Sequence, residues 1–175
     1  MKFIFVRHGQ TDTNVKSERG EIILEDDAPL NATGLEQAKA VAQALKNEKV
    51  DAIFVSTYKR ALETAKEIAA FHDAEFIKMD GLKERDGGDL VQERWHDLFD
   101  FDKNLGGGDI ETVGDFFQRI YDTIDQIRES GFNTVIVVSH GGVYHAFQAY
   151  FEKLEWKGNL RIGRLKNCEY RVFEI

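Results

Sequence analysis

The stretch Phe3-Ile4-Phe5-Val6-Arg7-His8-Gly9-Gln10-Thr11 joins a short apolar run to a histidine between an arginine and a glycine. A similar arrangement occurs far downstream, where Thr134-Val135-Ile136-Val137-Val138 is followed by Ser139-His140-Gly141-Gly142. The second run is short, β-branched and bounded by Asn133 and glycines, which predicts a buried strand. Each of the two histidines therefore follows a predicted strand, and this suggests one shared site.

Apolar residues at helical spacing and short apolar runs alternate along the rest of the chain. Helices are predicted over 33–45, with Asn31 or Thr33 as the cap, and over 61–69, 113–127 and 142–151. Further strands are predicted over 51–55 and 74–78, with an edge strand over 168–175. This alternation predicts an α/β protein, a three-layer α/β/α sandwich with a largely parallel central sheet.

The length of 175 residues, with 42% hydrophobic residues, allows one sizeable core. We therefore predict a single domain over 1–175. Residues 81–104 show no sustained period, so 79–110 are predicted to form an irregular insertion near the rim of the site. The single cysteine, Cys168, is expected to be a half-buried structural thiol.

The charge and the N-terminus limit the partners and the location of the protein. A net charge of −8 argues against nucleic acid or an anionic membrane as partner, and an anionic substrate would need a locally positive pocket. Only four consecutive apolar residues precede Arg7, too few for a signal peptide or a membrane span. A cytoplasmic location is expected, and the oligomeric state stays open.

Ligand groups in open α/β sheets gather beyond the carboxyl ends of the strands. His8, Arg60 and His140 all lie just past predicted strand ends, so the topology predicts that they meet. Arginine forks match phosphate oxygens, and a neutral imidazole can attack phosphorus when its other nitrogen is held by an acceptor. We therefore expect phosphoryl chemistry, with His8 placed for attack and His140 for binding.

A leaving oxygen needs a proton donor, and carboxylic acids lie in a predicted loop near this rim. The candidates are Glu84, Asp86 and Asp89. A carboxyl group close to a bound anion has a raised pKa, which suits a general acid. Asp86 and Asp89 are only slightly worse candidates than Glu84, and sequence position alone does not choose among the three.

These motifs, in this order, resemble the histidine phosphatase superfamily, with its phosphoglycerate mutase-like branch as the closest match. The resemblance spans residues 3 to about 147. It is carried by Arg7-His8-Gly9, Thr11, Asn14, the stretch from Leu30 to Ala38, Ser56, Arg60, Thr64, Glu84 and Ser139-His140-Gly141. Several motifs in the right order are far more specific than Arg-His-Gly alone.

The resemblance implies a phosphoglycerate mutase-like fold, a small phosphorylated substrate, and neither a metal nor another cofactor. It makes His8 the phosphorylated nucleophile and Glu84 the general acid and base. The implied phosphate-binding residues are Arg7, Thr11, Asn14, Arg60, His140 and Gly141.

Two alternatives to a phosphomonoester hydrolase remain. One is phosphoglycerate mutase-type phosphoryl transfer, but Leu90 to Leu105 does not align with the Arg-Arg and Lys elements of the cofactor-dependent mutases, which favours hydrolysis. The other is a catalytically silent phosphate-binding module. A metal site is disfavoured because His8 and His140 lack a His or Cys partner at a typical metal-ligand spacing.

Overall fold

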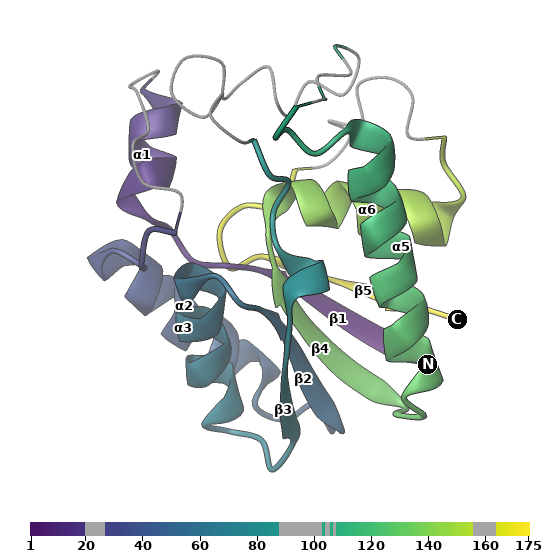
Figure 1. Ribbon diagram of the computed structural model, residues 1–175. Helices are drawn as coiled ribbons and strands as arrows, with labels where there is room; N and C mark the ends of the chain where they lie inside the picture. Colours follow the sequence, from purple (N-terminus) through teal and green to yellow (C-terminus); the bar gives the residue numbers. More distant parts are fainter. Residues whose placement is uncertain (20–26, 88–102, 104–105, 107, 156–163) are drawn as a thin grey trace.

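The computed structural model describes residues 1–19, 27–87, 103, 106, 108–155 and 164–175, which form one sheet with helices on both faces (Figure 1). The strands are β1 (Lys2–Arg7), β2 (Ala52–Ser56), β3 (Glu75–Met79), β4 (Thr134–Ser139) and β5 (Tyr170–Glu174). The α-helices are α1 (Asp12–Glu18), α2 (Ala32–Leu45), α3 (Lys59–Ala69), α5 (Val113–Glu129) and α6 (Gly141–Glu152), and η1 (Asp80–Leu82) is a 3₁₀ turn.

The five strands are arranged in the order β3-β2-β4-β1-β5. The first four run parallel, and β5 pairs antiparallel with β1 at the edge. Arg7 of β1 lies opposite Ser139 of β4 in the register. His8 and His140 are the next residues along these neighbouring strands, so the register places both at the same edge of the sheet.

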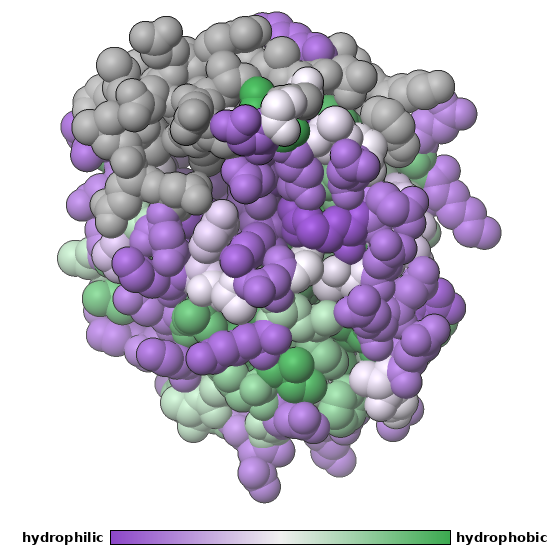
Figure 2. Space-filling view, viewed as in Figure 1, coloured by the Kyte–Doolittle hydropathy of each residue, from purple (hydrophilic) through white to green (hydrophobic). Residues whose placement is uncertain are grey.

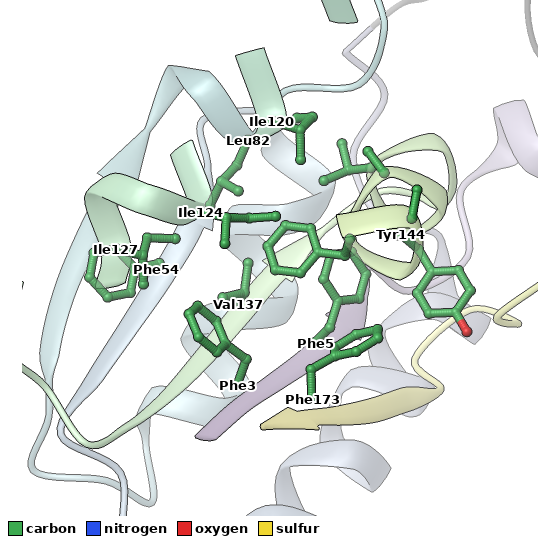
Figure 3. Close-up of a cluster of buried hydrophobic side chains, with 14 of the residues drawn as sticks. Phe3, Phe5, Phe54, Leu82, Ile120, Ile124, Ile127, Val137, Tyr144 and Phe173 are labelled. Carbon is green, nitrogen blue, oxygen red and sulfur yellow. The ribbon is translucent and has the colours of Figure 1, made fainter. Parts of the chain in front are cut away.

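Side chains that alternate along the strands build two cores, because successive residues point to opposite faces of a sheet. One face carries Phe3, Phe5 and Val137 against α5 and α6 (Figure 3). The other face carries Ile4 and Val6 among the residues packed against α2 and α3. The predicted three-layer α/β/α sandwich with a largely parallel sheet is confirmed.

Most predicted elements are found within a few residues of their expected ends. Of the two predicted caps of α2, Asn31 is the one observed. Its Oδ1 accepts a hydrogen bond from Gly34 N at 2.9 Å, whereas Thr33 lies inside the helix. Cys168 is half-buried, and burial raises the pKa of its thiol to about 12, as expected for a structural thiol.

Helix α1 is missing from the sequence prediction. It buries none of its residues, so it has no apolar stripe that periodicity could reveal. A capping box holds its start: Thr11 Oγ1 accepts from Asn14 N, and Asn14 Oδ1 accepts from Thr11 N, each at 3.1 Å. The spacing Thr-x-x-Asn is the local signal that would have indicated this helix.

The predicted insertion over 79–110 lies largely outside the described residues. Its first described part contains Met79, the last residue of β3, followed by η1 and the stretch that carries Glu84.

Hydrophilic residues predominate on the face of the protein shown in Figure 2, and apolar residues gather in the lower half of that face. Among the helices described, none combines the length and apolar character of a membrane span.

Candidate active site

Two buried histidine rings and an arginine form the centre of the site. The rings of His8 and His140 lie with their centroids 5.1 Å apart, and both side chains are buried. Arg60, in the first turn of α3 beyond β2, places its Nε 3.3 Å from His8 Nε2. Three segments that are far apart in the sequence thus meet at one edge of the sheet, as the topology predicts.

The hydrogen bonds of His8 fix its tautomer. Nδ1 lies 2.7 Å from the carbonyl oxygen of Gly9, which can only accept, so Nδ1 carries the ring proton. The guanidinium of Arg60 can only donate to Nε2, so Nε2 keeps its lone pair. The geometry therefore prepares Nε2 as a nucleophile.

The surroundings of His8 also keep the ring neutral. Burial lowers the pKa of His8 well below its usual 6.5, and the positive charges of Arg60 and Arg7 lower it further. Only the bond to the Gly9 carbonyl favours the charged form. A neutral imidazole surrounded by cations can attack an anion that those same cations bind.

His140 is held by a hydroxyl group at the end of β2. Its Nε2 lies 2.7 Å from Ser56 Oγ, and Tyr58 N donates to the same oxygen at 3.4 Å. The Ser56 hydroxyl can donate to His140 Nε2 or accept from it, because a hydroxyl has one proton and two lone pairs. Nδ1 is buried and makes no hydrogen bond within the described part of the chain, so it is the ring nitrogen of His140 that can contact a ligand.

Glu84 comes from the loop after η1 and is buried. Its Oε1 accepts from Arg85 N at 3.1 Å, and its Oε2 accepts from Gly142 N, in the first turn of α6, at 2.9 Å. Burial raises the pKa of the carboxyl group above its usual 4.5, against the opposing effect of these amides and of Arg60 and Arg7. A raised pKa suits a carboxyl group to act as a general acid.

The other two acid candidates have weaker positions. Asp86 is exposed to solvent. Asp89 lies outside the described residues. Of the carboxyl groups that the structure describes in this loop, Glu84 is the one enclosed with the histidines and arginines.

Arg7 and Gly141 lie side by side at the same edge. A Cβ atom built on Gly141 would be 3.6 Å from Arg7 Nε. Arg7 Nη1 donates to the carbonyl oxygen of Leu165 at 2.7 Å, which orients the guanidinium. Its Nε is buried and has no hydrogen-bond partner among the described residues, so this donor is available to a bound anion.

Thr11 and Asn14 are placed at the start of α1, where each caps the backbone of the other. Asn167 links this cap to the catalytic centre, because its Nδ2 donates to His8 O at 3.0 Å and to Asn14 Oδ1 at 3.2 Å. Sequence reasoning missed Asn167. No local pattern marks it, since it lies 159 residues from His8 along the chain.

Thr64 and Gly9 support the loop that carries His8, and sequence reasoning gave neither a structural role. Gly9 N donates to Thr64 Oγ1 at 3.0 Å, and that hydroxyl donates to Arg60 O at 2.8 Å. A Cβ atom on Gly9 would lie 2.5 Å from Gly34 O, so only glycine allows the loop to approach the start of α2 this closely. The position of Thr64 one turn after Arg60 is a signal that could have found it.

Across the part of the chain that the structure describes, no three His, Cys, Asp or Glu side chains are grouped so that they could hold a metal ion.

Residues 3–175 match the family model of the histidine phosphatase superfamily (branch 1). The chain belongs to the histidine phosphatase superfamily. It is 33% identical to the uncharacterised phosphatase PhoE of Bacillus subtilis (strain 168), covering 81% of this chain and 72% of that protein. It is also 33% identical to a metal-independent phosphoserine phosphatase of Arabidopsis thaliana, over 91% of this chain and 72% of that protein.

Among solved structures, the fold is similar to that of the phosphoserine phosphatase of Entamoeba histolytica in complex with 3-phosphoglyceric acid. It aligns with a TM-score of 0.75 at 25% identity, over 99% of this chain and 90% of the other. These matches confirm the family and the fold that the sequence predicts.

Proposed function

We propose that this histidine phosphatase hydrolyses a small phosphorylated metabolite through a phosphohistidine at His8. The observation that carries the proposal is the tautomer of His8. Nδ1 is committed to the Gly9 carbonyl, and Nε2 keeps its lone pair next to the Arg60 guanidinium. Phosphatase activity agrees with the names of the relatives in Bacillus subtilis and Arabidopsis thaliana.

In the first half of the reaction, Nε2 of His8 attacks phosphorus. The new N–P bond forms as the bond between phosphorus and the leaving oxygen breaks, and Glu84 gives its proton to that oxygen. Arg7 and Arg60 and the Nδ1 proton of His140 stabilise the charge on the other phosphoryl oxygens. The Gly141 amide, at the start of α6, is a further donor that we assign to the same group.

In the second half, the Glu84 carboxylate takes a proton from water. The hydroxide oxygen attacks phosphorus, the N–P bond breaks, and neutral His8 and inorganic phosphate result. Glu84 is then protonated again, so the enzyme returns to its starting state. Asn14 acts from the start of α1, where it keeps the His8 loop in place through Asn167, and Thr11 holds Asn14 there through the capping box.

The setting that we propose follows from charge and composition. The net charge of −8 supports a small anionic substrate bound in a local cationic pocket, and opposes nucleic acid or an anionic membrane as partner. The single, half-buried cysteine supports a reducing, cytoplasmic location.

The test measures phosphate release from p-nitrophenyl phosphate and from a panel of phosphorylated metabolites, with EDTA present. We expect EDTA-resistant turnover by the wild type, its loss in His8→Ala, and its retention in His72→Ala, a histidine outside the site. Full activity of His8→Ala would overturn the proposal. Phosphoglycerate isomerisation without net phosphate release would identify a mutase, and binding without turnover would identify a silent module.

A further inference from the structure

The loop of residues 80–86, which we call the acid loop, is held by side chains from two other elements. Arg119 of α5 donates from Nη1 to Gly81 O at 2.8 Å and to Lys83 O at 3.1 Å. Ser139, the last residue of β4, donates from Oγ to the carbonyl of Leu82, between these two, at 2.7 Å. Three successive carbonyls directly before Glu84 are therefore bound by side chains.

Arg119 is itself locked in place by Glu111. Nε and Nη2 each lie 2.7 Å from one carboxylate oxygen of Glu111, which is a bidentate pair. The guanidinium also lies over the ring of Phe116, 5.2 Å from its centroid. Both charged side chains are mostly buried, so their geometry is better defined than that of an exposed surface pair.

Glu111 holds the acid loop on the other side of Glu84. Its Oε2 accepts from Asp86 N at 3.2 Å, and its backbone N donates to Asp86 O at 3.1 Å. Its carbonyl oxygen accepts from Arg85 Nε at 3.0 Å. The pair Arg119–Glu111 therefore contacts the backbone both before and after Glu84.

We infer that Arg119, acting with Glu111, is a positioning residue that keeps the Glu84 carboxyl group within reach of the leaving oxygen. The inference rests on the proposed function of Glu84. Glu84 itself is held only by backbone amides of Arg85 and Gly142 among the described residues, and Arg85 belongs to the same loop. If the loop shifts, the carboxyl group shifts with it, and a misplacement of about 1 Å can cost about 10²-fold in rate.

The experiment compares kcat/KM for two substrates that differ in their need for a proton donor. An alkyl phosphomonoester such as phosphoserine has a basic leaving oxygen and needs the acid, whereas 2,4-dinitrophenyl phosphate has a leaving group that departs unprotonated. Glu84→Gln is the reference. We expect Arg119→Ala to lower kcat/KM for the alkyl ester by about 10²-fold and to leave the dinitrophenyl ester nearly unchanged.

Two further variants sharpen this comparison. Arg128→Ala is the matched control, because Arg128 also lies on α5 and pairs with an aspartate, Asp125, at 2.8 Å, but donates to Tyr150 rather than to the acid loop. It should leave both substrates unaffected. Glu111→Gln keeps the shape of the side chain but removes its charge, so it should show the same selective loss as Arg119→Ala to a smaller degree.

The outcomes are distinct. Selective loss in Glu84→Gln and in Arg119→Ala supports the inference. Selective loss in Glu84→Gln alone, or an equal loss on both esters in Arg119→Ala and Glu111→Gln, overturns the positioning role but keeps the proposed function. An unselective Glu84→Gln overturns the acid role and the inference with it. Thermal unfolding of each variant identifies any that fail to fold, and Glu111→Gln then carries the test.

Discussion

At the scale of single residues, the chemistry depends on two opposite pKa shifts with one shared cause. Burial disfavours the charged form of any group, so it lowers the pKa of His8 and raises that of Glu84. Burial therefore favours the neutral histidine that acts as nucleophile and the protonated carboxyl group that acts as acid. The arginines reinforce the first shift and oppose the second, and burial prevails at Glu84.

The shifts predict the pH profile of kcat/KM. The active form needs neutral His8 and protonated Glu84. Because the pKa of His8 lies well below 6.5, activity persists to low pH and is lost only as pH falls through that lowered value. Activity also falls at higher pH, as pH rises through the pKa of Glu84, which lies above 4.5. In Glu84→Gln this second fall should disappear; an unchanged fall would contradict the assignment.

Ser56 offers a second prediction at this scale. Replacing Ser56 by Ala removes the hydroxyl that holds the ring of His140, and leaves the buried Nε2 without its partner. We expect kcat/KM to fall about tenfold, equivalent to about 1.4 kcal/mol, and the free energy of unfolding to fall by about 1–3 kcal/mol. Ser56→Thr keeps the hydroxyl and should retain more activity. Equal activity of the alanine and threonine variants would rule out this role.

At the scale of elements, parallel strands and the helices that follow them assemble the site. β1, β2 and β4 are buried and β-branched or aromatic, so the sequence reveals them, and their carboxyl ends bring His8, Arg60 and His140 together. Helix α1 escaped prediction because it is held by a capping box rather than by an apolar face. The segment around Asn167 escaped because its contacts with His8 are long-range and depend on the final fold.

Helix α5 links the core to the site, which gives a prediction for stability. Ile120 of α5, the residue after Arg119, is fully buried in the core (Figure 3). Ile120→Ala should lower the free energy of unfolding by about 2–5 kcal/mol, because it leaves a cavity. Gln118→Ala, at an exposed position of the same helix, should change it by less than about 0.5 kcal/mol. Urea unfolding measures both, and similar values would contradict this packing.

At the scale of the whole molecule, an acidic protein gathers cationic side chains at one edge of its sheet. The total charge is −8, yet Arg7 and Arg60 lie beside the two histidines at one edge of the sheet. That His8, Arg60 and His140 lie close together was predictable, because each follows a strand end. How the acid loop is fixed was not, because Arg119 and Glu111 lie on a helix and a connection that no motif ties to Glu84.

The arginines beside the two histidines predict that inorganic phosphate stabilises the folded protein. At a free concentration of about one hundred times its Kd, a ligand adds about 2.7 kcal/mol to the free energy of unfolding. This corresponds to a rise in Tm of several degrees for a domain of this size. Arg60→Ala should abolish the rise, whereas Arg128→Ala, on the far end of α5, should retain it. Thermal unfolding with and without phosphate measures the effect, and an equal rise in both variants would place the anion elsewhere.

Phosphorylation of His8 can be detected by trapping the phosphoenzyme. Rapid quenching in alkali during turnover of a phosphomonoester, followed by mass spectrometry of the peptide that contains His8, detects the intermediate. We expect one added phosphoryl group on His8 that is stable in alkali and lost in acid, and none in His8→Ala. A phosphoryl group on another residue, or turnover by His8→Ala, would contradict the account.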